Sequence, residues 1–261
     1  MKRMLNIAFW VFFFMGFFIL WGFTLSEQGS VRCNKFVVNI EVQEGMTFIS
    51  QEDIETMLKQ VNLYPVGKEM NEISISEIEN RLDQIAEVKK TEVYKSIDGN
   101  VYVKVKQRKP IVRIINANGT SFYLDEEGYQ MPLSDNYTAR VPLVNGYINE
   151  PVTKMSAVEI AKSDLLKDQM KTDDVYRLAK FIKRDEFWSA QIQQIYYNHE
   201  GDIELIPSVG EHRIVFGNLD RMEGKFNKLM IFYKDGLNRT NWNIYDTINV
   251  KFKNQIICTK K

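Results

Sequence analysis

The chain has 261 residues, in which 34 lysines and arginines are balanced by 34 aspartates and glutamates. This balance excludes a strongly basic surface and argues against nucleic acid as a partner. The two cysteines, Cys33 and Cys258, lie near opposite ends of the chain. We therefore expect two unpaired thiols and a fold stabilised by its hydrophobic core.

An uncharged apolar stretch at residues 5–25 predicts a membrane span. A helix of this length covers about 32 Å, against a hydrocarbon core of about 30 Å. Lys2 and Arg3 precede the stretch, so the positive-inside rule places residues 1–4 in the cytoplasm and the rest of the chain across the membrane. The alternative is a cleaved signal peptide, but no small-residue cleavage site follows the apolar run. We expect an uncleaved, single-pass anchor.

Residues 26–34 are short and polar and indicate a linker, and a small domain follows at residues 35–106. Helix caps, apolar periodicity and an Asp98-Gly99 turn predict its elements. The order strand, helix, helix, strand, strand indicates an α+β domain with two helices on one sheet. The expected elements are a strand at 35–42, a helix capped by Ser50, a helix capped by Ser76, and strands at 88–95 and 101–106.

Residues 107–261 are expected to form a second, mainly antiparallel β domain with interspersed helices. Short strand-like runs alternate there with Gly-containing turns, which is typical of such domains. Thr172 is expected to cap one helix, residues 224–234 predict another, and residues 151–171 are either a helix or an ordered insertion. The expected strands are 111–115, 121–124, 130–131, 192–197, 203–206, 213–216 and 244–252.

Few residues are arranged in the patterns typical of catalytic or metal-binding sites. Asp125, Glu126 and Glu127 form one turn, whereas glycoside hydrolysis needs two carboxylates facing each other across a substrate. His199 and His212 belong to no Cys/His array, and a zinc site needs three or four ligands. We expect no catalytic residue, metal or cofactor, although a membrane-anchored envelope hydrolase stays open as an alternative.

The end of the chain carries a more specific pattern. Apolar and polar residues alternate over 248–252, and the phase slips at 254–255, which indicates a turn or bulge. Ile256 and Cys258 then share one face, and Ile257 lies on the other. A terminal strand of this kind is either an ordinary core strand or a sheet edge on which a partner can dock.

Five segments in chain order resemble the FtsQ/DivIB family of bacterial cell-division proteins, and the small domain resembles that family's POTRA module. Gln107 replaces the usual Glu of the first segment, and Asn249 replaces the usual acidic residue of the last. Residues 151–171 have no counterpart in the family pattern, and the cytoplasmic tail is short. The five segments are 103–112, 122–132, 141–146, 213–217 and 247–252.

The resemblance implies a non-enzymatic scaffold of the divisome, in the inner membrane at the division septum. Such proteins bind the bitopic proteins FtsB and FtsL, and other divisome proteins, and help control septal peptidoglycan synthesis. The partner is expected to add a strand to the C-terminal edge of the β domain. A POTRA-containing translocation or assembly factor is a further alternative. The partner-binding residues implied are Phe252, Asn254, Gln255, Ile256, Ile257, Cys258 and Thr259.

Overall fold

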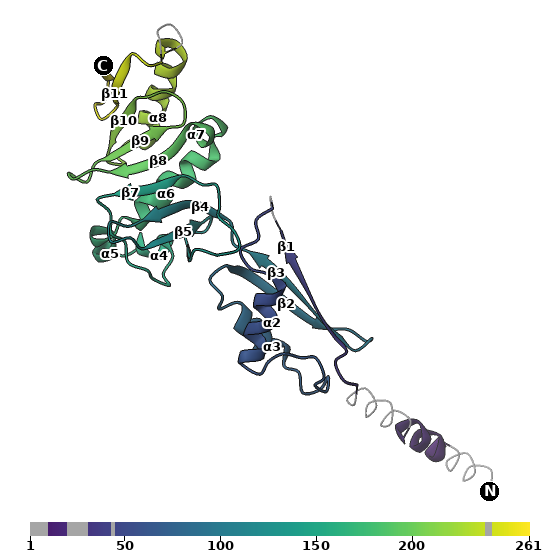
Figure 1. The fold of residues 1–261 in the computed structure, drawn as a ribbon. Helices are drawn as coiled ribbons and strands as arrows, with labels where there is room; N and C mark the ends of the chain where they lie inside the picture. The colour runs from purple at the N-terminus through teal and green to yellow at the C-terminus, as the bar shows by residue number, and fades with distance from the viewer. Residues whose placement is uncertain (1–9, 20–30, 43–44, 238–241) are drawn as a thin grey trace. The chain divides into compact units, whose positions relative to one another are not determined.

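The structure is a computed structural model with a mixed α+β fold, and it describes residues 10–19, 31–42, 45–237 and 242–261. The chain divides into two compact units between Gln107 and Arg108 (Figure 1). Only part of the predicted span at 5–25 is described, and residues 10–19 of it are helical. Among the described helices, none has the length and apolar character needed to cross a membrane. Residues 1–9 and 20–30 lie outside the described part.

The first unit has the predicted order of strand, helix, helix, strand and strand. Its sheet has the order β1-β3-β2, in which β1 and β3 run parallel and β2 pairs antiparallel with β3 through the predicted hairpin. The helices bury Ile54, Leu58, Ile78 and Leu82 against inward side chains of the sheet. The elements are β1 (Lys35–Glu41), α2 (Gln51–Gln60), α3 (Ile75–Leu82), β2 (Val88–Lys95) and β3 (Asn100–Gln107).

The two helix starts had different outcomes. Ser50 and Asp53 form the expected capping box at the start of α2. The prediction that Ser76 caps the second helix is wrong, because α3 begins at Ile75 and the Ser74 hydroxyl accepts the Glu77 N–H at 3.3 Å. The earlier start lets Ile75 pack against the core in line with the buried Ile78.

Gln107, at the end of β3, ties a distant loop to the sheet. Its side-chain oxygen accepts the N–H groups of Phe48 and Ile49, at 2.8 and 3.2 Å. Its amide nitrogen donates to the Met46 carbonyl at 3.2 Å. The two accepted bonds need only a side-chain oxygen, which Gln and Glu both supply.

The second unit is built on a nine-stranded sheet of order β12-β11-β10-β9-β8-β7-β4-β5-β6. Most neighbours pair antiparallel, but β4–β7, β7–β8 and β10–β11 are parallel. Parallel neighbours need long crossovers, and helices α4 to α7 and helix α8 supply two of them. The strands are β4 (Pro110–Ile115), β5 (Ser121–Asp125), β6 (Gln130–Met131), β7 (Leu143–Gly146), β8 (Ile192–Tyr197), β9 (Ile203–Pro207), β10 (Arg213–Gly217), β11 (Tyr245–Asn249) and β12 (Ile257–Lys260).

One hydrophobic core joins the helices to one face of this sheet. Leu178 and Ile182 of α6, Trp188 of α7, and Phe226 and Leu229 of α8 are buried in it with alternate strand residues. The helices are α4 (Ala157–Ile160), α5 (Asp164–Gln169), α6 (Thr172–Arg184), α7 (Glu186–Gln191) and α8 (Met222–Ile231), which continues as the π-helix η1 (Phe232–Gly236).

One prediction for this unit needs correction, and one that was left open is resolved. The strand expected at 244–252 is shorter and spans Tyr245–Asn249, although the Val250 N–H still donates to the Val215 carbonyl of β10 at 3.0 Å. Residues 151–171, expected as a helix or an ordered insertion, contain the two short helices α4 and α5, and the buried residues of α4 are Ala157 and Ile160.

The prediction that Thr172 caps α6 is also wrong, because Glu150 does so from a distant loop. The buried Glu150 carboxylate accepts the backbone N–H groups of Lys171 and Thr172, both at 2.8 Å, and the Thr172 hydroxyl at 2.5 Å. The Asn116 side chain fixes Glu150 in turn, with two hydrogen bonds of 2.8 Å to the Glu150 backbone. Negative charge at a helix N-terminus is favourable, so one carboxylate replaces a local cap.

His212 is a buried imidazole inside an aromatic cluster. Its Nε2 lies 2.8 Å from the Tyr233 hydroxyl, and the rings of Trp188 and Trp242 pack against Tyr233. Burial lowers the pKa of His212. The folded protein therefore favours the neutral imidazole.

Replacing Glu150 with Ala should destabilise the second unit. One buried and one partly buried N–H group and one hydroxyl lose their acceptor, so the free energy of unfolding should fall by about 2–3 kcal/mol. Urea denaturation of the full-length protein measures this change. Glu150→Gln keeps one acceptor oxygen and should cost less. The exposed Glu200→Ala is the control and should change stability by no more than about 0.5 kcal/mol. Equal losses for Glu150→Ala and Glu200→Ala would contradict the capping role.

Acidification should destabilise the protein through His212. The unfolded imidazole has a pKa of about 6.5, and the folded pKa is lower, so the unfolded state binds more protons below that pH. The stabilisation is complete above about pH 6.5 and is lost as the pH falls further. The urea midpoint at pH 5.5 relative to pH 7.5 should drop less in His212→Gln than in the wild type. His199→Gln, which changes an exposed histidine, should keep the wild-type pH dependence. A drop in the urea midpoint from pH 7.5 to pH 5.5 that is as large in His212→Gln as in the wild type would refute this assignment.

Candidate functional site

The terminal strand β12 forms one edge of the nine-stranded sheet (Figure 1). It pairs antiparallel with β11, with Ile257 opposite Asn249 and Thr259 opposite Thr247. Within the described residues, no strand pairs with its other side. The sheet therefore ends in a short strand with one free edge.

The hydrogen-bond pattern identifies the backbone groups that face outward. The Lys261 N–H donates to the Ile244 carbonyl at 3.1 Å, so the backbone groups of Lys261 point toward β11. Alternate residues of an antiparallel strand face alternate sides, and the register irregularity lies at Tyr245–Thr247 of β11, so we infer that Ile257 and Thr259 also bond to β11. By the same alternation, the N–H and C=O groups of Cys258 and Lys260 point away from β11, and no described strand pairs with them.

The side chains alternate as the sequence predicts. Ile256 and Cys258 pack against the hydrophobic core. Ile257 is 45% exposed, and its side chain lies on the opposite face of the sheet. The cross-strand register places it in one row with Asn249 and Val215. The backbone of an added strand would hydrogen-bond to the edge of β12. One of its side chains would contact Ile257.

The seven predicted site residues do not all belong to this strand. Ile257, Cys258 and Thr259 lie in β12, and Ile256 immediately precedes it. The other three, Phe252, Asn254 and Gln255, lie in the exposed turn between β11 and β12. The structure therefore joins four of the seven along the edge and places three in the turn that leads to it.

Lys228 of α8 holds this turn, and sequence reasoning missed it. Its ammonium group donates to the carbonyls of Val250 at 3.1 Å, Gln255 at 3.4 Å and Phe252. Partial burial lowers the pKa of Lys228. The sequence around Lys228 does not indicate which groups its ammonium binds, because the three carbonyls belong to a segment more than twenty residues further along the chain.

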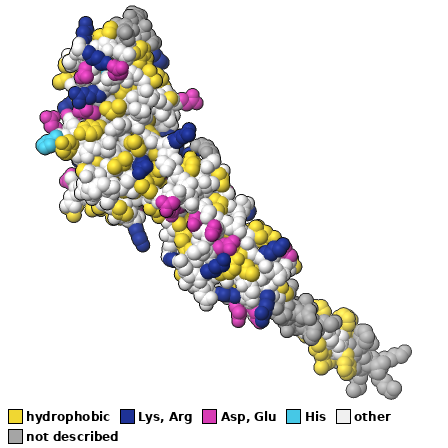
Figure 2. Space-filling model, viewed as in Figure 1, with side chains coloured by type: hydrophobic (Ala, Val, Ile, Leu, Met, Phe, Trp, Pro, Cys, Tyr) yellow, Lys and Arg dark blue, Asp and Glu magenta, His cyan; other side chains and the backbone are white. Residues whose placement is uncertain are grey.

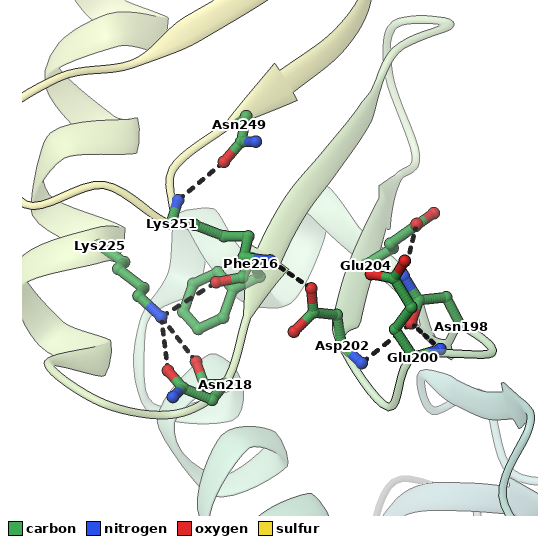
Figure 3. Close-up of polar contacts among 9 residues, drawn as sticks. All are labelled: Asn198, Glu200, Asp202, Glu204, Phe216, Asn218, Lys225, Asn249 and Lys251. Atoms are coloured by element: carbon green, nitrogen blue, oxygen red, sulfur yellow. Dashed lines mark hydrogen bonds and ion pairs between the residues drawn. The ribbon is translucent and has the colours of Figure 1, made fainter.

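Lys225, three residues before Lys228, anchors the same helix to β10. This buried ammonium donates to the Phe216 carbonyl at 3.0 Å, and to the carbonyl and side-chain oxygens of Asn218 at 2.7 and 3.1 Å (Figure 3). Burial lowers the pKa of Lys225. The two lysines fix α8 to the strand on one side and to the β11–β12 turn on the other.

Asn249 and Lys251 complete the support at the start of this turn. The Asn249 side-chain oxygen accepts the Lys251 N–H at 3.0 Å, and the Lys251 ammonium pairs with Asp202 (Figure 3). A carboxylate at position 249 could accept the same bond, so this contact does not depend on whether the residue is acidic or an amide. Gly217 is required beside them, because its φ is +77° and an added Cβ would approach the Lys251 side chain at 2.8 Å.

The acidic and histidine residues considered in the sequence have structural contacts. Asp125 is buried, pairs with Arg108 at 2.8 Å, and accepts the N–H groups of Glu127 and Tyr129. His199 packs edge-on against Tyr147. In the part of the chain that the structure describes, no three His, Cys, Asp or Glu residues are placed to hold a metal ion. Figure 2 shows lysines and arginines interspersed with acidic residues over the visible face.

The fold and the terminal edge define a protein with a POTRA-like domain followed by a β domain. A family model described as a POTRA-like domain matches residues 31–106. A second, described as FtsQ/DivIB, C-terminal related, matches residues 109–259, which is more than half of the chain. The chain belongs to the FtsQ/DivIB family, whose members are non-catalytic scaffolds of cell division. A search of curated proteins found no match.

Replacing Lys228 with Met should loosen the β11–β12 turn while the rest of the sheet stays intact. Loss of a charged donor to three carbonyls weakens this local structure by about 1–2 kcal/mol. Amide hydrogens within residues 250–261 should then exchange about tenfold faster, because local opening controls their exchange. Hydrogen exchange with mass spectrometry measures this. The exposed Lys234→Met is the matched control. Wild-type exchange in Lys228→Met would show that the lysine does not hold the turn.

Proposed function

We propose that this chain is a membrane-anchored divisome scaffold that binds an FtsB- or FtsL-like bitopic protein by strand addition at β12. The observation that carries the proposal is the free edge of β12, which is one of the two terminal strands of the nine-stranded sheet, the other being β6. Unpaired edges either pair with another chain or need protection, and no strand covers this one among the described residues. The family to which the chain belongs supports a division partner.

The backbone of the edge would supply much of the affinity. Cys258 and Lys260 each present one N–H and one C=O outward, and a partner strand would satisfy these groups as a ladder neighbour does. The turn held by Lys228 keeps the strand in register before the partner binds. Such preorganisation reduces the ordering cost of binding.

Side chains on the open face would supply the specificity. Ile257 is the exposed apolar group of the strand, and Thr259 lies two residues further on the same face. Alternate residues of an added strand would contact this face. The exposed Lys253 and Lys260 favour acidic residues in the partner segment, because complementary charge steers association.

Membrane attachment is part of the same proposal. The uncharged stretch at 5–25 would anchor the chain in the inner membrane, with residues 1–4 in the cytoplasm and both units outside it. A bitopic partner shares this membrane, so association there is confined to two dimensions. The proposed site of action is the division septum, where the scaffold would help to regulate peptidoglycan synthesis.

The two other classes have less support. A hydrolase needs a free acid and base in a cleft, whereas Asp125 is occupied by Arg108 and two backbone N–H groups. A translocation or assembly factor would share the POTRA-like domain, but the match of residues 109–259 is to the division family.

Cys258→Pro should abolish partner binding with little effect on the sheet. Proline removes an N–H that points away from β11, and proline is tolerated at a sheet edge on that side. Cys258→Ala keeps the N–H and is the matched control. Full-length variants co-expressed with a tagged FtsB-like protein should show at least a tenfold loss of co-purification for Cys258→Pro and none for Cys258→Ala.

The side-chain contribution is tested separately with Ile257→Glu, which should weaken co-purification. Ile257→Pro is less informative, because it also breaks a hydrogen bond to β11. The thermal unfolding midpoint of each variant shows whether the sheet is intact. Normal recovery of the partner by Cys258→Pro would eliminate strand addition at this edge.

A further inference from the structure

The hairpin between β2 and β3 carries an unexpected apolar side chain at its tip. Ile97 is 101% exposed, the highest value among the large hydrophobic residues that the structure describes. The turn itself is ordered, because the Ser96 N–H donates to the Asn100 carbonyl at 2.9 Å and the Gly99 N–H donates to the Ser96 carbonyl at 3.2 Å. Turns favour Gly, Asn, Asp, Ser and Pro, and this β-branched apolar side chain is not buried against the residues that the structure describes.

A single exposed hydrophobic residue is ordinary on a protein surface. Ile97, however, has apolar neighbours at the same end of the unit. The residues that line a shallow hollow beside it include Val31 and Met70, and Val31 is itself 41% exposed. Val66 is also exposed, in the loop that pairs with the chain just after Val31. We call the exposed pair Ile97 and Val31 the apolar tip.

The chain enters the first unit at this same tip. The Met70 N–H donates to the Val31 carbonyl, and Cys33 exchanges hydrogen bonds with Lys68 and Gly67, all at 2.8–2.9 Å. The Asn34 N–H donates to the Gly99 carbonyl at 2.9 Å, which joins this segment to the hairpin. The point at which the N-terminal part of the chain is attached is thus fixed beside Ile97.

This attachment bounds the distance from the tip to the membrane. The predicted span ends at Leu25, six residues before Val31. Six residues reach at most about 21 Å even when fully extended. The interfacial layer adds about 5–8 Å to each side of the hydrocarbon core, so the tip is within reach of the lipid headgroups.

Charge around the tip favours neither attraction to nor repulsion from a lipid surface. Arg32, Lys68 and Lys95 lie there together with Glu69 and Asp98. A contact would therefore depend on apolar insertion and would be insensitive to salt.

We propose that the tip of the POTRA-like unit contacts the lipid bilayer, with Ile97 inserted into the interfacial layer. This inference rests on the membrane anchor of the proposed function and adds a second point of contact. Two contacts, the anchor and the hairpin, would restrict the tilt of the first unit on the membrane. Attachment through the span alone would not restrict that tilt.

The test compares two apolar positions at opposite ends of the same sheet. Val42 directly follows β1, at the end remote from the hairpin, and is 51% exposed. In full-length protein carrying Cys33→Ser and Cys258→Ser, a nitrobenzoxadiazole fluorophore is attached to Ile97→Cys or to Val42→Cys. Both proteins are reconstituted into phosphatidylcholine vesicles with and without nitroxide-labelled lipid.

The fluorophore at position 97 should emit at shorter wavelength than that at position 42, and nitroxide lipid should quench it at least twofold more. High salt should leave this difference unchanged. Alkaline extraction of the same vesicles tests the membrane anchor separately from the hairpin contact. Retention in the membrane with equal quenching at both positions would overturn the hairpin contact and leave the anchor standing. Release from the vesicles would overturn both.

Discussion

Backbone groups removed from water must find hydrogen-bond partners, and in this protein a few side chains supply them where secondary structure does not. Glu150 takes up the free N–H groups at the start of α6, and Gln107 takes up those of the loop before α2. Lys225 and Lys228 serve the carbonyls on either side of α8. Each joins segments that lie apart in the chain, so the arrangement of the elements depends on them as much as on the hydrophobic core.

At the terminal strand β12, the backbone groups on one side have no ladder partner among the described residues. An open sheet always ends in two strands with one unpaired side, and at β12 that side carries the outward groups of Cys258 and Lys260. Lys228 holds the preceding turn by donating to its carbonyl groups. An edge strand that is already held in place suits strand addition, because little conformational entropy is lost from that strand when a partner binds.

The sequence predicted the elements better than their ends. Alternation over residues 101–106 and the Asp98-Gly99 turn gave the hairpin, because both signals are local. The caps were harder: the sequence pattern predicted Ser76, whereas Ser74 caps α3 and Ile75 packs against the core. Thr172 has the right chemistry for a cap, but it is the first residue of α6, and Glu150 accepts its N–H group and that of Lys171. Long-range capping has no signature in a local pattern.

The candidate site shows the same division. The sequence by itself determined the alternation of Ile256, Ile257 and Cys258 and the interruption before them, since side-chain direction follows from a period of two. Only the tertiary structure decided that this strand is an edge, that Cys258 turns its backbone outward, and that Lys228 holds its turn. Side-chain periodicity depends on consecutive residues, whereas the pairing of strands depends on which distant segments lie side by side in the folded chain.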